Sequence, residues 1–160
     1  MPISQFVDLL ASREQFLDAL RAVAHSLSKK STVEWTCRCV RAAAGENMTK
    51  ADEAAVKAAE AWAAEPSEEL RRQAQTAADA TQLSTPAGWA AMAAFFSSGS
   101  LAPPAAPVVP PEPHLTAHAA AGAVMLAAVV TQPEKANQRY TEFLRPVSYT
   151  HLTLPTNREV

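Results

Sequence analysis

Two histidines four residues apart are the first candidates for chemistry in this chain. On one helical face, the imidazoles of His114 and His118 could ligate a metal ion. A zinc protease motif also needs an acid directly after the first histidine, and a third ligand. Here Leu115 follows His114, Pro113 places it outside the predicted helix, and the sequence suggests no further ligand. We therefore predict packed or partly exposed histidines, with no metal site and no cofactor.

Cys37 and Cys39 are the two cysteines of the chain. On a helix, side chains two residues apart point about 200° from each other, so these sulfurs should not bond. The spacing is not that of a CxxC motif, and no second pair completes a zinc site. We predict two reduced thiols packed in the core as small hydrophobes. The alternative is a nucleophilic thiol close to His25 or His118.

No other catalytic arrangement is suggested. His25 is alone on its predicted helix, without a recognisable nucleophile and orienting acid. No glycine-rich run could cradle a phosphate. Glu34 opens an apolar helix beside Trp35, where the helix dipole already explains an acid. We therefore predict a protein that is not an enzyme, with a small helical hydrolase that uses a cysteine nucleophile as the alternative.

Composition and charge limit the class of protein. A net charge of −2 gives no electrostatic reason to expect nucleic acid or an anionic membrane as a partner. Residues 116–130 are the most apolar stretch, but a membrane span needs about 20 such residues. The N-terminus MPISQFVDLL lacks a basic region and a cleavage site. We therefore predict no secretory signal and a cytoplasmic location.

The stretch from Thr49 to Leu83 is predicted to form two Ala-rich helices around which the others pack. Thr49 caps the first helix, and Pro66 ends it because proline has no N–H and would clash with the preceding turn. Ser67 then starts the second helix. Small residues let the two helices approach closely, and Trp62 supplies bulk. On the second helix we expect Leu70, Ala74, Ala77, Ala78 and Thr81 to face inward, and Arg71, Arg72 and Gln75 to face outward.

Two helices are predicted before this hairpin. Ser12 and Gln15 read as a capping box that starts the first. Residues 29–32 are expected to connect it to a second helix over 33–44, which Gly45 caps at its C-terminus. The core face of the first helix is predicted to be Phe16, Leu20, Val23 and Leu27.

Three helices are predicted after the hairpin. Thr85 as N-cap and Pro86 at the first helical position start one of them. Residues 116–130 are apolar on all sides and indicate a core helix. Pro133 opens the last. The buried stripes are predicted to be Trp89, Met92, Ala93 and Phe96 in the first of these, and Ala136, Tyr140, Phe143 and Leu144 in the last.

Residues 100–113 interrupt this series of helices and hold half of the twelve prolines. Such a run favours extended polyproline geometry. We predict a strap along the surface of the bundle, between the fifth and sixth helices. A ligand for SH3-type domains is the alternative, although no adjacent Arg or Lys supports that mode.

The expected fold is all-α: a single antiparallel bundle of six or seven helices over residues 1–145, with the proline-rich surface strap inside it. Residues 4–10 are expected to add at most a short helix. The length of the chain suits one domain with a real core. The structural core is predicted to include Trp35, Trp62, Trp89, Phe96, Cys37, Cys39, Leu20 and Val124.

Residues 147–160, VSYTHLTLPTNREV, differ from everything before them. The string resembles a transposase-type sequencing adapter translated in one frame, which reads VSYTHLTLPT. The resemblance implies that residues 146–160 are an adapter-derived, non-native tail, and that the true C-terminus beyond Arg145 is missing. We assign no function to the tail. A genuine strand-forming tail is the alternative.

Several runs resemble an uncharacterised bacterial all-helical family, known only as a domain of unknown function. They are AHSLSKKSTVEWTCRCVRAA, AVKAAEAWAAEPSEELRRQAQTAADA, TPAGWAAMAAFFSSGSLAPP and LTAHAAAGAVMLAAV with RYTEFL. The resemblance covers most of residues 14–145. It implies an all-helical fold, and it carries over no catalytic residue because the family has no established activity.

A weaker likeness is to small Ala-rich helical proteins proposed as immunity partners of bacterial toxins. It rests on Trp35, Cys37 and Cys39 in one helix and on the Ala-rich helix that ends at Trp62. We therefore expect a non-enzymatic interaction module with an unidentified protein partner, accessory to a secretion or toxin–immunity system. Besides the cysteine hydrolase, a structural domain of a larger, truncated protein is an alternative.

Overall fold

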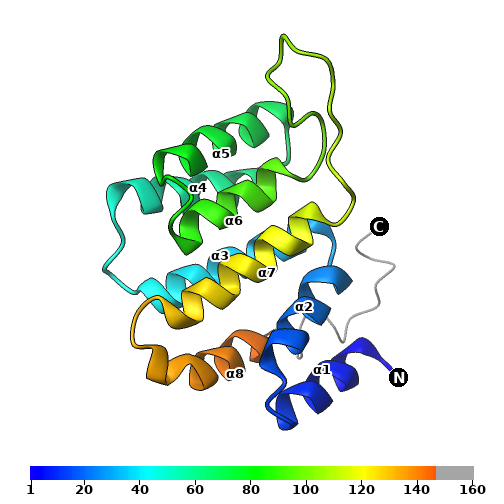
Figure 1. The fold of residues 1–160 in the computed structure, drawn as a ribbon, viewed down its shortest axis with the longest axis vertical. Coiled ribbons are helices and arrows are strands. Elements are labelled where there is room, and N and C mark those ends of the chain that lie inside the picture. The colour runs from blue at the N-terminus through cyan, green and yellow to red at the C-terminus, as the bar shows by residue number, and fades with distance from the viewer. Residues whose placement is uncertain (147–160) are drawn as a thin grey trace.

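The computed structural model describes residues 1–146 and shows an all-helical fold (Figure 1). No strand is present within that range. Residues 147–160, where the adapter-derived tail is predicted, lie outside the described residues. The helices are α1 (Ile3–Ser12), α2 (Phe16–Ser26), α3 (Lys29–Ala44), α4 (Lys50–Ala64), α5 (Glu68–Ala80), α6 (Pro86–Phe95), α7 (Leu115–Val129) and α8 (Ala136–Pro146), with a short 3-10 turn η1 (Pro133–Lys135) before the last.

The all-α helical bundle is confirmed, but the expected number of helices was too low. Eight α-helices lie in the described part of the chain, against six or seven predicted. The additional one is α1, a complete helix of ten residues that buries Val7.

Helix α7 is the centre of the bundle. It packs against α6, α3 and α2, and more lightly against α8. In Figure 1 it crosses the middle of the molecule, with α4, α5 and α6 on one side and α1, α2 and α8 on the other. The predicted all-round apolar character is confirmed, because its alanines, Thr116 and Val124 are buried. Helices that meet through alanine can lie close together.

The predicted ends of several helices are confirmed by their capping bonds. Thr49, Ser67 and Thr85 are N-caps, and each side-chain oxygen accepts a hydrogen bond from the backbone N–H three residues later, at 3.1 to 3.3 Å. Gly45 follows α3 with a φ of 59°, a conformation that glycine adopts at little cost. These signals are local, so the sequence was sufficient to locate them.

The predicted capping box at Ser12 was wrong. Ser12 is the last residue of α1, and its hydroxyl donates to the Leu9 carbonyl at 2.7 Å. Helix α2 begins at Phe16 after Gln15, which makes no side-chain capping bond. The serine satisfies a carbonyl at a C-terminus, which is the other common use of a hydroxyl near a helix end.

The predicted connection over residues 29–32 was also wrong. Helix α3 begins at Lys29, one turn earlier than expected. Ser28 is its N-cap and accepts from the backbone N–H of Ser31 at 3.1 Å. The two lysines therefore lie in the first turn of α3, where the helix dipole does not favour them.

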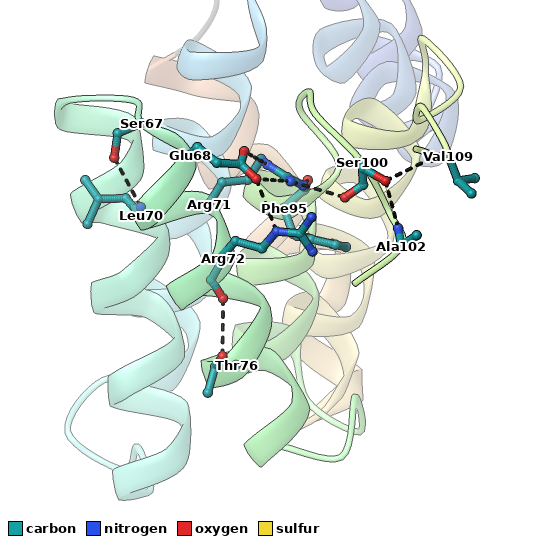
Figure 2. A network of polar contacts seen from close by, with 10 residues as sticks. All are labelled: Ser67, Glu68, Leu70, Arg71, Arg72, Thr76, Phe95, Ser100, Ala102 and Val109. Atoms are coloured by element: carbon teal, nitrogen blue, oxygen red, sulfur yellow. Dashed lines mark hydrogen bonds and ion pairs between the residues drawn. The ribbon is translucent and has the colours of Figure 1, made fainter. Parts of the chain in front are cut away.

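Arg71 on α5 corrects the predicted outward face of that helix, because the residue is fully buried. Its guanidinium makes two bonds to the Glu68 carboxylate, at 2.6 and 2.7 Å (Figure 2). It also donates to the carbonyls of Phe95 at 2.8 Å and Ser100 at 3.1 Å. The guanidinium carbon lies 4.7 Å from the centroid of the Phe95 ring. This network fixes the end of α6 against α5.

Glycine at position 99 is required by the same network. Its φ of +70° favours glycine, and a Cβ there would lie 2.7 Å from a terminal nitrogen of Arg71. The chain therefore passes directly over the guanidinium before it enters the proline-rich segment.

The proline-rich segment is exposed at the surface, as expected, but it is not a continuous strap along the bundle. The Ser100 hydroxyl accepts from the backbone N–H groups of Ala102 at 3.1 Å and Val109 at 2.9 Å. The Leu101 N–H donates to the Val109 carbonyl at 2.8 Å. These bonds close residues 101–109 into a loop that projects beyond the ends of α5 and α6 (Figure 1).

We predict that Arg71→Met lowers the free energy of unfolding by about 3–5 kcal/mol, because the carbonyls of Phe95 and Ser100 lose a donor and Glu68 loses its main partner. Urea unfolding would measure the change. The matched control is Arg72→Met, at the next position and also bonded to Glu68 at 3.1 Å. It should cost less than about 1 kcal/mol. Equal losses in the two variants would contradict a special role for the buried arginine.

Candidate functional site

The structure buries six of the eight residues predicted to form the core and leaves two only partly buried. Trp89 and Phe96 on and after α6 are the exceptions. The face of α6 that enters the core carries Phe95 and alanines instead. Small residues allow α6 to sit between α4, α5 and α7, and the larger side chains are turned to the rim. The six buried residues are Leu20, Trp35, Cys37, Cys39, Trp62 and Val124.

These two aromatic side chains form one wall of an open groove between α6 and α7. The groove has a volume of about 490 Å³. The Trp89 indole is held in place because its Nε1 donates to the Leu83 carbonyl at 3.0 Å. Gly122 lies in the other wall, and a Cβ there would meet nothing within 4 Å. The groove is lined by Trp89, Phe96, Leu115, His118, Ala119, Gly122 and Leu126.

Three histidines meet at one end of this groove. His25 in the last turn of α2 has its ring centroid 5.4 Å from that of His114 and 5.0 Å from that of His118. His118 also lines the groove. The sequence correctly showed one histidine on α2, but it missed the cluster because the packing of α2 against α7 joins residues about ninety positions apart.

The electrostatics of the cluster disfavour a proton on His25. Partial burial lowers its pKa below the ordinary 6.5, and the neighbouring His118 and His114 lower it further. Glu112, in the turn before α7, acts in the opposite direction. In residues 1–146, no three side chains of His, Cys, Asp or Glu are arranged to hold a metal ion.

The two cysteines are buried on α3. Burial, with a smaller effect of Glu60, raises the pKa of the Cys37 thiol to about 12. Burial also raises the pKa of the Cys39 thiol. Both therefore stay protonated near neutral pH, whereas a nucleophile must be a thiolate. Glu34 lines a small cavity of about 260 Å³ with Cys37 and Glu60.

A second large cavity, of about 450 Å³, lies at the opposite end of α7. Four of its polar side chains, those of Asp52, Thr85, Thr131 and Arg139, already bond within the fold. Thr85 donates its hydroxyl to the Asp52 carboxylate at 2.7 Å, which ties α6 to α4. Arg139 on α8 donates to the Ala128 carbonyl at 3.0 Å and to the Thr131 carbonyl, which caps the C-terminus of α7. We read these contacts as structural.

Between residues 1 and 146, none of the individual helices combines the length and the apolar character that a membrane span requires.

Comparison with protein families gives one match. The model of a family of unknown function, DUF6931, matches residues 6–146. The resemblance to an uncharacterised all-helical family is thereby confirmed, and it extends eight residues further toward the N-terminus than expected. No curated protein and no solved structure matches the chain.

We predict that neither thiol reacts with a thiol reagent in the native protein. Cys37 should carry about a thousandfold less thiolate than a free cysteine, because its pKa is raised from 9.0 to about 12. Reagent consumption should begin only as urea unfolds the chain, and then account for both cysteines. A thiol that reacts rapidly in the folded state would restore the cysteine-nucleophile alternative.

We also predict that protonation of His25 destabilises the fold. Since its pKa is lower in the folded protein, the unfolded chain binds the proton first as the pH falls below about 6.5. The free energy of unfolding should be unaffected by this group above that pH and should fall below it. Urea midpoints at about pH 7.5 and about pH 5.5 should differ more in the wild type than in His25→Gln. An equal difference would show that the pKa of His25 is not lowered in the folded protein.

Proposed function

We propose that this chain, which belongs to the family of unknown function DUF6931, is a non-enzymatic module that binds a segment of a partner protein in the groove between α6 and α7. The observation that carries the proposal is the pair of large aromatic side chains left partly exposed on an otherwise alanine-packed helix. Trp89 and Phe96 line the groove together with Leu115 and Leu126. Partly exposed aromatic side chains in an apolar hollow are typical of protein-binding sites.

The lining of the groove favours a protein segment over a small reactant. Small-molecule sites are also mostly apolar, but a few precisely placed polar groups orient the ligand in them. Here His118 is the one polar side chain in the lining. Apolar side chains of a helical or extended segment match such a surface better than a polar metabolite does.

The rim of the groove indicates the charge of that segment. Lys29 donates to the carbonyl of Ser97, directly after Phe96, at 2.8 Å. The three histidines lie at the same end, with Glu112 as the acid that acts on His25. The complementary segment therefore carries apolar side chains next to acidic ones.

The proposal extends to a bacterial, cytoplasmic setting, with the module as an accessory to a secretion or toxin–immunity system. The weaker likeness to immunity proteins supports this part, as does the alanine- and tryptophan-based scaffold. The high pKa of Cys37 counts against the cysteine hydrolase.

The test is to select binders from a display library of random peptides of about twelve residues. Selected peptides should bind Gly122→Leu at least about tenfold more weakly than the wild type, because the leucine fills the groove. That substitution should not harm the fold, since Gly122 has open space and leucine is the better helix former.

The matched control is Ala61→Leu, which adds a leucine to an exposed position on α4. It should leave binding unchanged. Thermal unfolding of both variants would verify that they are folded. A library that yields no peptide sensitive to Gly122→Leu would overturn the proposed function.

A further inference from the structure

The packing of the helices does not by itself require histidine at the three positions of the cluster. Its three side chains are exposed and come from two separate elements, the end of α2 and the start of α7. The ring centroids of His114 and His118 lie 5.4 and 5.0 Å from that of His25. Protonated imidazoles at these distances would repel one another, so the three cannot all be charged without an electrostatic cost. Exposed helix ends would be equally well served by lysine or serine.

His118 connects this cluster to the groove. It lies one turn after Leu115 on α7, and both side chains line the groove. A segment bound against Leu115 and Phe96 therefore extends past the imidazole of His118. An acidic residue on that segment would lie beside His118, whose ring centroid is 5.0 Å from that of His25.

The charged groups around the cluster are compatible with one more carboxylate there. Glu112 is the carboxylate that raises the pKa of His25, and its effect is smaller than those of burial and the two histidines. On α2, Arg21 is paired with Asp18 at 3.3 Å. On α3, the Lys29 ammonium donates to the Ser97 carbonyl. The cluster thus has the donors and the titratable groups for one more carboxylate.

We infer that His25, His114 and His118 form a proton-coupled recognition site for a carboxylate of the segment bound in the groove. This inference rests on the proposed function. The incoming carboxylate accepts a hydrogen bond from an imidazole and favours its protonated form, so binding takes up a proton from solution. Imidazoles ordinarily titrate near pH 6.5, which places this coupling in the physiological range.

Proton uptake makes the affinity depend on pH in a predictable direction. Where the free cluster is mostly neutral, uptake of one proton tightens binding by up to about tenfold for each unit of pH decrease. Between about pH 7.5 and about pH 6 we expect the dissociation constant to fall about five- to twentyfold. Peptide carboxylates stay ionised over this window, because they titrate near pH 4.

The test uses groove-binding peptides from the random library, defined by their sensitivity to Gly122→Leu. Dissociation constants would be measured at both pH values, with EDTA present to exclude bridging by metal ions. Each peptide would be compared with a twin in which its acidic residues are replaced by their amides. Calorimetry in two buffers of different ionisation enthalpy would count the protons taken up.

The expected result is tighter binding at lower pH for the acidic peptide, and no pH dependence for the amide twin. In His118→Gln and in His25→Gln, the dissociation constant should depend less on pH than it does in the wild type, whether or not the substitution also changes the affinity at a single pH. That readout separates carboxylate recognition from a loss of packing. Thermal unfolding would verify that both variants are folded.

Two failures can be told apart. If groove-binding peptides bind without proton uptake, the inference is wrong while the proposed function stands. If they carry no acidic residues, the inference and the acidic character proposed for the segment are both wrong, while the groove remains a peptide-binding site. If no peptide is sensitive to Gly122→Leu, the groove is not a peptide-binding site, and the proposed function and the inference fail together.

Discussion

The buried guanidinium of Arg71 is the interaction on which the groove end of the bundle depends. The last carbonyls of α6 have no N–H partner in their own helix, and Arg71 supplies a donor to one of them, that of Phe95. It also donates to the Ser100 carbonyl in the segment that follows α6. Removing this cation from water is costly, and the paired Glu68 carboxylate and the Phe95 ring offset that cost. The pairing also lowers the pKa of Glu68 to about 2. Phe96, which follows directly, is thereby held at the groove.

Alanine packing explains why a groove exists beside this network. The alanine-rich face of α6 packs against α4, α5 and α7, so the helices approach too closely for tryptophan to fit between them. Trp89 and Phe96 are consequently displaced to the rim, where they remain partly exposed. Gly122 on α7 leaves the space opposite them unfilled. The proposed binding surface is therefore a direct result of how the core is packed.

The reactive side chains are divided between the core and the surface. Cys37 and Cys39 lie in the core, where burial raises their pKa values and removes thiolate chemistry near neutral pH. The histidines lie at the surface, where imidazoles can exchange protons with solvent. This distribution supports the proposed pH-sensitive recognition and counts against a mechanism that needs a thiolate.

The sequence by itself determined the local features: the caps at Thr49, Ser67 and Thr85, and the core character of α7. Each depends on residues within a turn of one another or on a long apolar run. Only the tertiary structure decided that Arg71 is buried, that Trp89 lines a groove, and that three histidines meet. These depend on which face of a helix meets which neighbour. A helical pattern shows that two faces differ, but the partner helix determines which polar side chain enters the core and finds its acceptors there.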